Sequence, residues 1–413
     1  MPATPFERAI SLDAADPLAV YRERFVGSLA SSTEPVLAYL DGNSLGRPLK
    51  STAARLAAFV TDSWGDRLIR GWDEEWLQLP TTIGDELARA TLGAAPGQTL
   101  IGDSTTVLLY KVIRAALDAR PGRTEIIVDS DNFPTDRYLV EGIAAERALT
   151  VRWVETSRRS GLTADLLAAA LSEQTAVVVA SHVAYRSGYL ADVPALTRLA
   201  HDAGALIVWD LCHSAGSVET RLDDWGVDLA VGCTYKYLNG GPGSPAFAYV
   251  RRDLLGELRQ PIWGWLGHAD PFAMGPGYTP APGIRSFQSG TPPVIGMLAM
   301  RDMIALIGEV GVEAVRAKSV ALTSFTIELA DEVLAPYGVE VASPRASAER
   351  GSHVTLDHPD FREIVAELWR GGVVPDFRAP EGLRVGLSPL STSFTEVAVG
   401  IAAVRDALER RAA

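Results

Sequence analysis

Short β-branched runs alternate with helical patterns between about residues 95 and 260, and this alternation constrains the fold most. The runs predict strands at 124–130, 175–183, 205–211, 229–235 and 246–252. Between them, apolar residues recur three and four positions apart, which predicts helices at 104–119, 135–148 and 193–204. Nearly continuous apolar strands separated by amphipathic helices indicate a mostly parallel sheet covered on both faces. We therefore expect an α/β fold.

The pattern changes after Pro293. A long apolar helical stretch, roughly 294–333, leads into short strand-like runs on either side of a helical segment at 360–372. This α+β pattern predicts a smaller C-terminal domain. We expect three parts: an N-terminal arm (1–50) that joins the small domain, a large domain (51–293), and a linking helix with the small domain (294–413).

Composition excludes several classes of function. The net charge of −13 argues against nucleic acid or an anionic membrane as the main partner. Two cysteines, Cys212 and Cys233, provide neither a disulfide framework nor a zinc site, and the six histidines are scattered. The sequence lacks an 18-residue uncharged apolar run and, at its start, a signal-peptide pattern. We expect a cytoplasmic protein, without a metal, that acts on a small molecule.

Polar side chains follow the predicted strands at one edge of the sheet. Asp210 ends one strand, with His213 three residues later, and Lys236 follows the next strand in "GCTYKYLNGGPGSPAF". Phe133 and Asp136 follow a third strand. A helix expected to begin near Val107 is preceded by three hydroxyl residues, Ser104, Thr105 and Thr106. Ligands of doubly wound sheets bind at the carboxyl ends of the strands, so these residues predict one site.

Lys236 stands apart from the other three lysines of the chain. Lys111 and Lys318 lie in the middle of predicted helices, where we expect surface lysines with extended stems, and Lys50 opens a helix. Only Lys236 combines a strand-end position with a glycine-rich loop. A lysine whose pKa is lowered by burial or a nearby cation can form a Schiff base.

Each residue of this cluster also has an ordinary structural explanation. Asp210 could cap a helix, a strand-end histidine more often serves as a structural hydrogen-bonding group, and Phe133 could belong to the core. The combination predicts a site for pyridoxal phosphate (PLP). The helix N-terminus would bind its phosphate, the carboxylate its pyridine nitrogen, and the lysine its aldehyde. Phosphate-loop, dinucleotide, zinc-protease and nucleophile-elbow motifs are absent from the sequence.

Seven sequence strings between about residues 39 and 390 resemble those of kynureninases, which are PLP enzymes. The strings are "YLDGNSLG", "LIRGWDEEW", "DNFPTDRY", "WDLCHSAG", "GCTYKYLNGGPGSPAF", "GWLGH" and "SGTPP". The resemblance implies the fold of the PLP-dependent transferases (aspartate aminotransferase, fold type I). It also implies a homodimer with shared active sites that hydrolyses L-kynurenine to anthranilate and L-alanine, in the kynurenine pathway of tryptophan degradation and NAD biosynthesis.

The resemblance also implies roles for single residues. Lys236 is the Schiff-base lysine, Asp210 pairs with the pyridinium nitrogen, and Tyr235 assists the addition of water and contacts the phosphate. Arg384 binds the substrate carboxylate. Further cofactor contacts are implied for Thr105, Thr106, Phe133, Asp136, Ser181 and His213, and, from the neighbouring subunit, for Trp265 and Thr291. The substrate pocket is shaped by Trp64, Asn43 and Ser44.

The chain departs from the family pattern at three positions, Leu108, Leu266 and Ser391, where asparagine, phenylalanine and tyrosine are usual. Other functions stay open: another PLP-dependent class V lyase, an aminotransferase, or a kynureninase that prefers 3-hydroxykynurenine. The resemblance associates a tryptophan and a threonine at the positions of Trp64 and Thr291 with a preference for kynurenine itself. A cysteine desulfurase needs a nucleophilic cysteine in its C-terminal half, and the chain has none after Cys233. A non-catalytic binding protein would have no reason to keep Lys236, Asp210 and Arg384 together.

Overall fold

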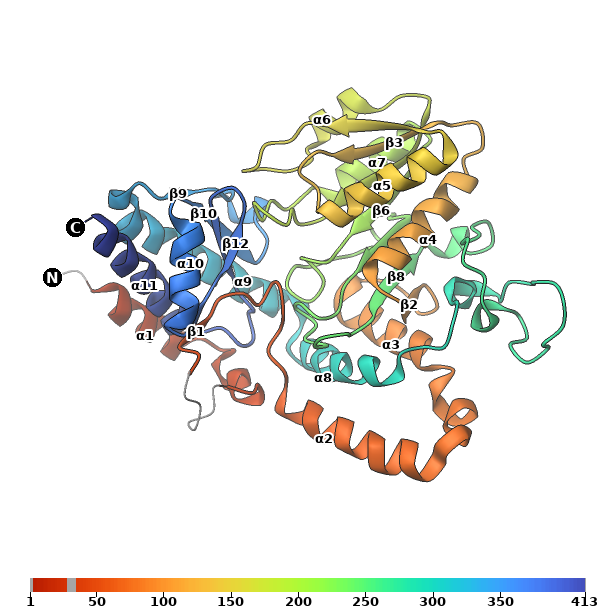
Figure 1. The fold of residues 1–413 in the computed structure, drawn as a ribbon, viewed down its shortest axis with the longest axis horizontal. Coiled ribbons are helices and arrows are strands. Elements are labelled where there is room, and N and C mark those ends of the chain that lie inside the picture. Colours follow the sequence, from red (N-terminus) through yellow and green to blue (C-terminus); the bar gives the residue numbers. More distant parts are fainter. Residues whose placement is uncertain (1–2, 28–34, 413) are drawn as a thin grey trace.

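The computed structural model describes residues 3–27 and 35–412, so part of the expected N-terminal arm lies outside the described residues. Two sheets form two lobes that lie side by side, and both ends of the chain lie at the smaller lobe (Figure 1). No helix in the described part of the chain is long and apolar enough to cross a membrane.

The larger sheet has seven strands in the order β2-β8-β7-β6-β5-β3-β4. Strands β3 to β7 pair in parallel, and β8 pairs antiparallel with both β2 and β7. The strands are β2 (Thr99–Gly102), β3 (Glu125–Asp129), β4 (Thr150–Val154), β5 (Thr175–Ser181), β6 (Leu206–Asp210), β7 (Leu229–Gly232) and β8 (Ala246–Val250). The expected α/β fold with a mostly parallel sheet is confirmed.

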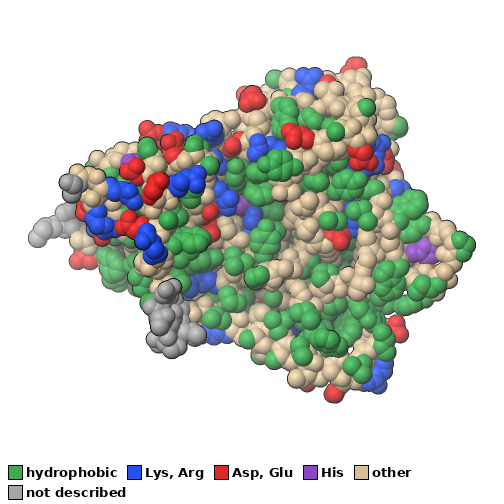
Figure 2. All heavy atoms as spheres, viewed as in Figure 1, with side chains coloured by type: hydrophobic (Ala, Val, Ile, Leu, Met, Phe, Trp, Pro, Cys, Tyr) green, Lys and Arg blue, Asp and Glu red, His purple; other side chains and the backbone are tan. Residues whose placement is uncertain are grey.

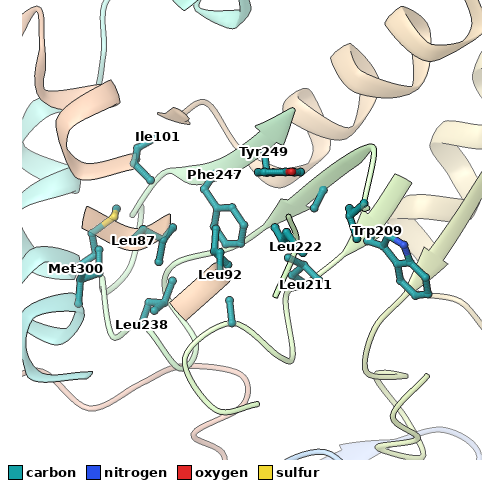
Figure 3. Packing of buried hydrophobic residues seen from close by; sticks show 14 of the residues in the cluster. Leu87, Leu92, Ile101, Trp209, Leu211, Leu222, Leu238, Phe247, Tyr249 and Met300 are labelled. Atoms are coloured by element: carbon teal, nitrogen blue, oxygen red, sulfur yellow. The ribbon is translucent and has the colours of Figure 1, made fainter. Parts of the chain in front are cut away.

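Alternate residues of these strands pack into two separate cores, one on each face of the sheet. One core contains α4 (Thr105–Asp118) and α5 (Pro134–Arg147). The other contains α3 (Leu79–Leu87), α7 (Val193–Asp202) and α8 (Val294–Val310). Figure 3 shows part of the second core, in which Phe247 and Trp209 of the sheet pack in one cluster with Leu87 and Met300. A sheet covered on both faces explains why its central strands are mostly apolar.

The smaller sheet is antiparallel, in the order β12-β13-β10-β9. Its strands are β9 (Glu340–Val341), β10 (His353–Asp357), β12 (Asp376–Arg378) and β13 (Gly382–Gly386). Four helices share its core: α1 (Pro5–Ala15), α9 (Val312–Leu329), α10 (Phe361–Arg370) and α11 (Phe394–Ala412). The short β1 (Ala38–Tyr39) pairs in parallel with β11 (Val373–Val374), which attaches the N-terminal segment to this lobe. The division of domains at residues 50 and 293 stays a proposal.

Several predicted boundaries were wrong. The stretch expected as one helix at 294–333 is broken at Gly311, whose φ of +86° ends α8 and starts α9. The strand predicted to reach Tyr235 already ends at Gly232, so Lys236 lies in the loop that follows β7. The helix expected near Val107 begins at Thr105.

Two lysines expected on the surface are buried instead. The Lys111 side chain is fully buried in α4, and its Nζ lies 2.6 Å from Asp103 Oδ2. Lys318 Nζ, also buried, lies 2.5 Å from Asp16 Oδ2. A charge in the interior requires a compensating partner, and each lysine has one carboxylate. Lys50 is exposed and opens α2 (Lys50–Ala58), as expected.

Candidate active site

The carboxyl ends of three parallel strands bring the candidate lysine next to its expected neighbours. Asp210 is the last residue of β6, and Ser181, the last of β5, lies opposite it. Lys236 Nζ lies 3.1 Å from His213 Nε2. Lys236, His213 and Asp210 are each more than nine-tenths buried. The loops after β6 and β7 therefore form one enclosed polar cluster.

His213 is held neutral by its surroundings. Burial moves the pKa of His213 well below its ordinary value, and the charges of Lys236 and Arg384 act in the same direction. An imidazole without charge keeps one nitrogen as an acceptor, and Nε2 can accept a hydrogen bond from the Lys236 ammonium group. The pair can therefore orient the lysine amine.

The N-terminus of α5 places Phe133 and Asp136 in the same cluster. Lys236 Nζ lies 5.8 Å from the centre of the Phe133 ring. Asp136 lies in the first turn of α5 and is 2% exposed, and within the described residues its Oδ2 has no hydrogen-bond partner. Burial raises the pKa of Asp136 well above its usual range, and Asp210 adds repulsion. A cationic or hydrogen-bonding group placed here would relieve both costs.

The turn before α4 has the features of a phosphate site. Ser104 is the N-cap of this 14-residue helix, and its Oγ accepts a hydrogen bond from Val107 N. Thr105 and Thr106 form the first turn, where backbone N–H groups lack partners within the helix. Cys212 Sγ lies 3.9 Å from Thr105 Oγ1, so this turn adjoins the loop that follows Asp210.

Tyr235 is half-buried next to Lys236 and also anchors the N-terminal segment. Burial raises the pKa of Tyr235 above its ordinary value, and the neighbouring Cys233 and Cys212 add to the shift. The phenol therefore keeps its proton and can donate a hydrogen bond. Tyr235 O accepts a hydrogen bond from Gly46 N at 2.8 Å. A Cβ at Gly46 would lie 2.3 Å from Lys236 O, so only glycine permits this approach.

Arg384, on β13, is 1% exposed and faces the same N-terminal segment. Its Nη1 donates to Tyr185 O at 2.7 Å and its Nη2 to Ser44 Oγ at 2.8 Å. Asn43 is fully buried, and with its amide oxygen turned toward the guanidinium it accepts from Arg384 Nε at 3.0 Å. Asp376 Oδ2 lies 2.7 Å from Nη2. Arg384 is therefore held in place on several sides.

The charges around Arg384 oppose one another. Burial lowers the pKa of Arg384 below its usual value, as does Arg378, whereas Asp376 and Asp41 favour its charged form. Burial also raises the pKa of Asp41 to about 6, and repulsion from Asp376 adds to the shift. A substrate carboxylate that reached Arg384 would compete with Asp376 for the guanidinium.

Trp64, Thr291 and Trp265 lie apart from this cluster within a single chain. Trp64 and Thr291 line one largely apolar cavity of about 530 Å³, whose lining contains neither Lys236 nor Arg384. Trp265 is 37% exposed in the short turn Trp265–Gly267. The departures from the family pattern, Leu108, Leu266 and Ser391, are all buried.

Sequence reasoning missed three polar residues near the cluster. The ring of His353, on β10, lies 5.7 Å from that of His213, and it is fully buried. Asn132 Oδ1 accepts a hydrogen bond from Ser181 Oγ at 2.9 Å, and Asp376 pairs with Arg384. Asn132 stands inside "DNFPTDRY", so its motif was a usable signal. Nothing in the sequence marks His353 or Asp376.

Solved structures with the same fold include PLP enzymes. A C-DES mutant with glycine covalently linked to its PLP cofactor has a TM-score of 0.81 at 20% identity, covering 93% of this chain and 99% of that one. The cysteine desulfurase of Thermococcus onnurineus NA1 has a TM-score of 0.76 at 18% identity, covering 90% and 95%. At these identities the likeness establishes the fold, and the expected PLP-enzyme architecture is confirmed.

Sequence comparisons identify the family. The family model for the kynureninase C-terminal domain matches residues 315–404. Kynureninase of Pseudomonas fluorescens is 39% identical over 409 residues, which is 97% of this chain and 95% of the relative. That of Deinococcus radiodurans is 41% identical over 418 residues, covering 99% and 98%. Since these similarities extend over nearly the whole of both chains, the chain belongs to the kynureninase family.

Proposed function

We propose that this enzyme binds PLP through Lys236 and hydrolyses L-kynurenine to anthranilate and L-alanine. The observation that carries the proposal is the buried Lys236–His213 pair beside Asp210, in a chain of the kynureninase family. PLP, when bound, stabilises negative charge on substrate carbon, which no amino-acid side chain can do.

The side chains around Lys236 fit this cofactor. Asp210 Oδ1 accepts a hydrogen bond from Cys212 N at 2.7 Å, which fixes the carboxylate that would face the pyridine nitrogen. Asp136 Oδ2, which has no hydrogen-bond partner among the described residues, is a second polar atom that the cofactor would satisfy. Thr105 and Thr106 would bind the phosphate, and Phe133 would lie against the ring. Ser181, tied to Asn132, and His213 complete the surroundings.

The remaining residues act on the substrate. Arg384, with Ser44 and Asn43, would bind its carboxylate, and Lys236 Nζ would accept the proton from Cα. The protonated phenol of Tyr235 can donate a hydrogen bond to the ketone oxygen as water adds. Cleavage of the Cβ–Cγ bond then requires a proton for the alanine side chain, which a donor in this cluster supplies.

Product analysis tests the proposed function. With L-kynurenine, purified enzyme should form anthranilate and L-alanine in equal amounts, whereas transamination would convert the substrate without releasing alanine.

The same assay, run with a second substrate, tests the preference for an unsubstituted ring. Trp64 offers a hydrogen-bond donor but no acceptor, so it orients a ring hydroxyl poorly. We expect a higher kcat/KM for L-kynurenine than for 3-hydroxy-L-kynurenine, and about a tenfold preference for the hydroxylated substrate would contradict this.

We also propose a homodimer with shared sites. Four exposed apolar side chains line the apolar cavity: Trp64, Leu68, Ile69 and Ile295. Contiguous apolar surfaces of this kind are typical of interfaces. Hydrophobic side chains gather over the lower part of the view in Figure 2, where Figure 1 draws α2 and α8. A second copy on this surface would bring Trp265 and Thr291 to its neighbour's phosphate.

Mixed dimers test this arrangement. We expect Lys236→Ala chains and chains with both Trp265→Ala and Thr291→Ala to be inactive alone. Mixed in equal amounts, they should regain about a quarter of wild-type activity, because half of the dimers carry one intact site. The control mixes Lys236→Ala with Arg384→Ala; both residues serve the same chain's site, so the mixture should be no more active than its Arg384→Ala chains are alone. A fully active monomer in sedimentation would contradict the proposal.

We propose further that the enzyme works in the cytoplasm, in tryptophan degradation and the pathway that leads to NAD. Cys212 and Cys233 are both free thiols, which suits a reducing compartment. Fractionation of cells that carry a tagged full-length chain checks the location, and recovery with membranes or in an exported fraction would contradict it.

A further inference from the structure

The buried lysine of α4 neutralises an aspartate that directly precedes the candidate phosphate site. Lys111 Nζ lies 2.6 Å from Asp103 Oδ2, and Asp103 is followed by Ser104, the N-cap of α4. The Lys111 side chain is fully buried, whereas that of Asp103 is 34% exposed. An acidic residue at this position would repel a phosphate dianion bound to the same turn.

The backbone at Asp103 needs this residue type. Its φ is +46°, in the left-handed region where aspartate and asparagine are tolerated best among residues other than glycine. Asp103 O accepts a hydrogen bond from Ala246 N at 3.0 Å, which ties the turn to the start of β8. The turn therefore accommodates an aspartate, whose charge is unfavourable beside a phosphate.

Lys111 has a second contact, which connects the turn with another candidate phosphate segment. Its Nζ donates to Phe287 O at 3.0 Å, four residues before Thr291. The same segment is linked to the turn at Trp265, because Leu266 N donates to Ser289 O at 3.3 Å. The Lys111 ammonium group thus lies between the Ser104–Thr106 turn and the segment that carries Trp265 and Thr291.

We infer that Lys111 is a positioning residue for phosphate binding: it neutralises Asp103 and keeps its carboxylate turned away from the helix N-terminus. The inference rests on the proposed function, because it presumes that PLP binds at Ser104–Thr106. It gives a role to a lysine that touches neither the substrate nor the reacting atoms. The pairing of Lys111 with Asp103 would allow a turn that contains an aspartate to bind the phosphate dianion of PLP.

The affinity of the apoenzyme for PLP tests the inference. Lys111→Met should weaken PLP binding by about tenfold, the scale of the repulsion between an unpaired carboxylate and a nearby phosphate dianion. Raising the ionic strength should shrink the deficit, because Asp103 is partly exposed and its charge is screened. Adding Asp103→Asn to Lys111→Met should restore most of the affinity, since asparagine keeps the left-handed turn without the charge. A purely structural role would give a deficit that neither salt nor the second substitution removes.

Lys318→Met is the matched control, because it removes the other buried lysine–aspartate pair, with Asp16, outside the candidate site. It should lower the melting temperature and leave PLP affinity unchanged.

Unchanged PLP affinity in Lys111→Met, or a double variant that binds PLP as weakly as the single one, overturns the inference. If Lys111→Met fails to fold, Asp103→Asn alone decides: it should bind PLP at least as tightly as the wild type, and a tenfold loss contradicts the inference. Wild-type apoenzyme that binds no PLP would instead refute the proposed function.

Discussion

Replacing Lys236 with alanine should abolish covalent attachment of PLP and reduce kcat/KM about a thousandfold or more, which is about 4 kcal/mol of transition-state free energy. The expected loss is large because two tasks are proposed for Lys236 Nζ, attachment of the cofactor and acceptance of the Cα proton. The other buried lysines cannot replace it: Lys111 and Lys318 are each engaged by an aspartate. Absorbance of the purified protein and mapping of the borohydride-reduced lysine measure the attachment.

Lys50→Ala is the control for this experiment. Lys50 is exposed at the start of α2, so its loss should change neither the absorbance nor the rate. A Lys236→Ala protein that still carries a borohydride-reducible, lysine-linked chromophore would contradict the assignment. Retention of PLP without the covalent link would agree with it, since the proposed phosphate and ring contacts are made by other residues.

The central strands could be predicted because their burial leaves a clear pattern in the sequence. Strands β3, β5, β6, β7 and β8 are covered on both faces and read as continuous apolar runs. Strand β4 was missed because it is the edge strand, largely exposed and interrupted by Arg152. Strand β2 was missed because its apolar run consists of Leu100 and Ile101 alone, between Thr99 and Gly102.

Some residues of the candidate site could be placed from the sequence, and others could not, because their contacts join distant parts of the chain. Asp210, His213 and Lys236 could be brought together from the sequence because parallel strands end at one edge of the sheet. The contact of Arg384 with Ser44 could not, because it joins positions 340 residues apart through the pairing of the smaller sheet with the N-terminal segment. Only the family resemblance pointed to those residues.

The two buried lysines show why a helical position alone does not reveal burial. Lys111 and Lys318 each lie in the middle of a helix, and an extended surface lysine has the same local sequence. The partner of Lys318 is 302 positions away, at Asp16. Asp103 lies only eight residues before Lys111, but it contacts the lysine only because the chain turns sharply there at a positive φ.

Arg384 should prove to be the main determinant of substrate affinity. A charge-assisted pair with the substrate carboxylate is worth about 1.5–3 kcal/mol, so loss of the guanidinium should raise KM about tenfold or more. Arg384→Ala would also remove one cationic partner of Asp376, which would keep its ion pair with Arg378. Arg384→Lys instead keeps the charge and loses the fork that bonds Ser44 and Tyr185. We therefore expect Arg384→Lys to fold normally, to bind PLP within about twofold of the wild type, and to show the higher KM.

Two further variants separate the role of Arg384 from simple packing. Arg350 is another fully buried arginine, bonded to Pro344 O and Arg345 O, so Arg350→Lys should affect stability while KM stays the same. Asp376→Asn removes the carboxylate that competes for the Arg384 guanidinium, so KM for kynurenine should fall. Steady-state kinetics with a parallel titration of PLP measure both effects. Loss of PLP binding in Arg384→Lys with an unchanged KM would assign Arg384 to the cofactor instead, because a residue that binds only the substrate carboxylate leaves the cofactor contacts intact.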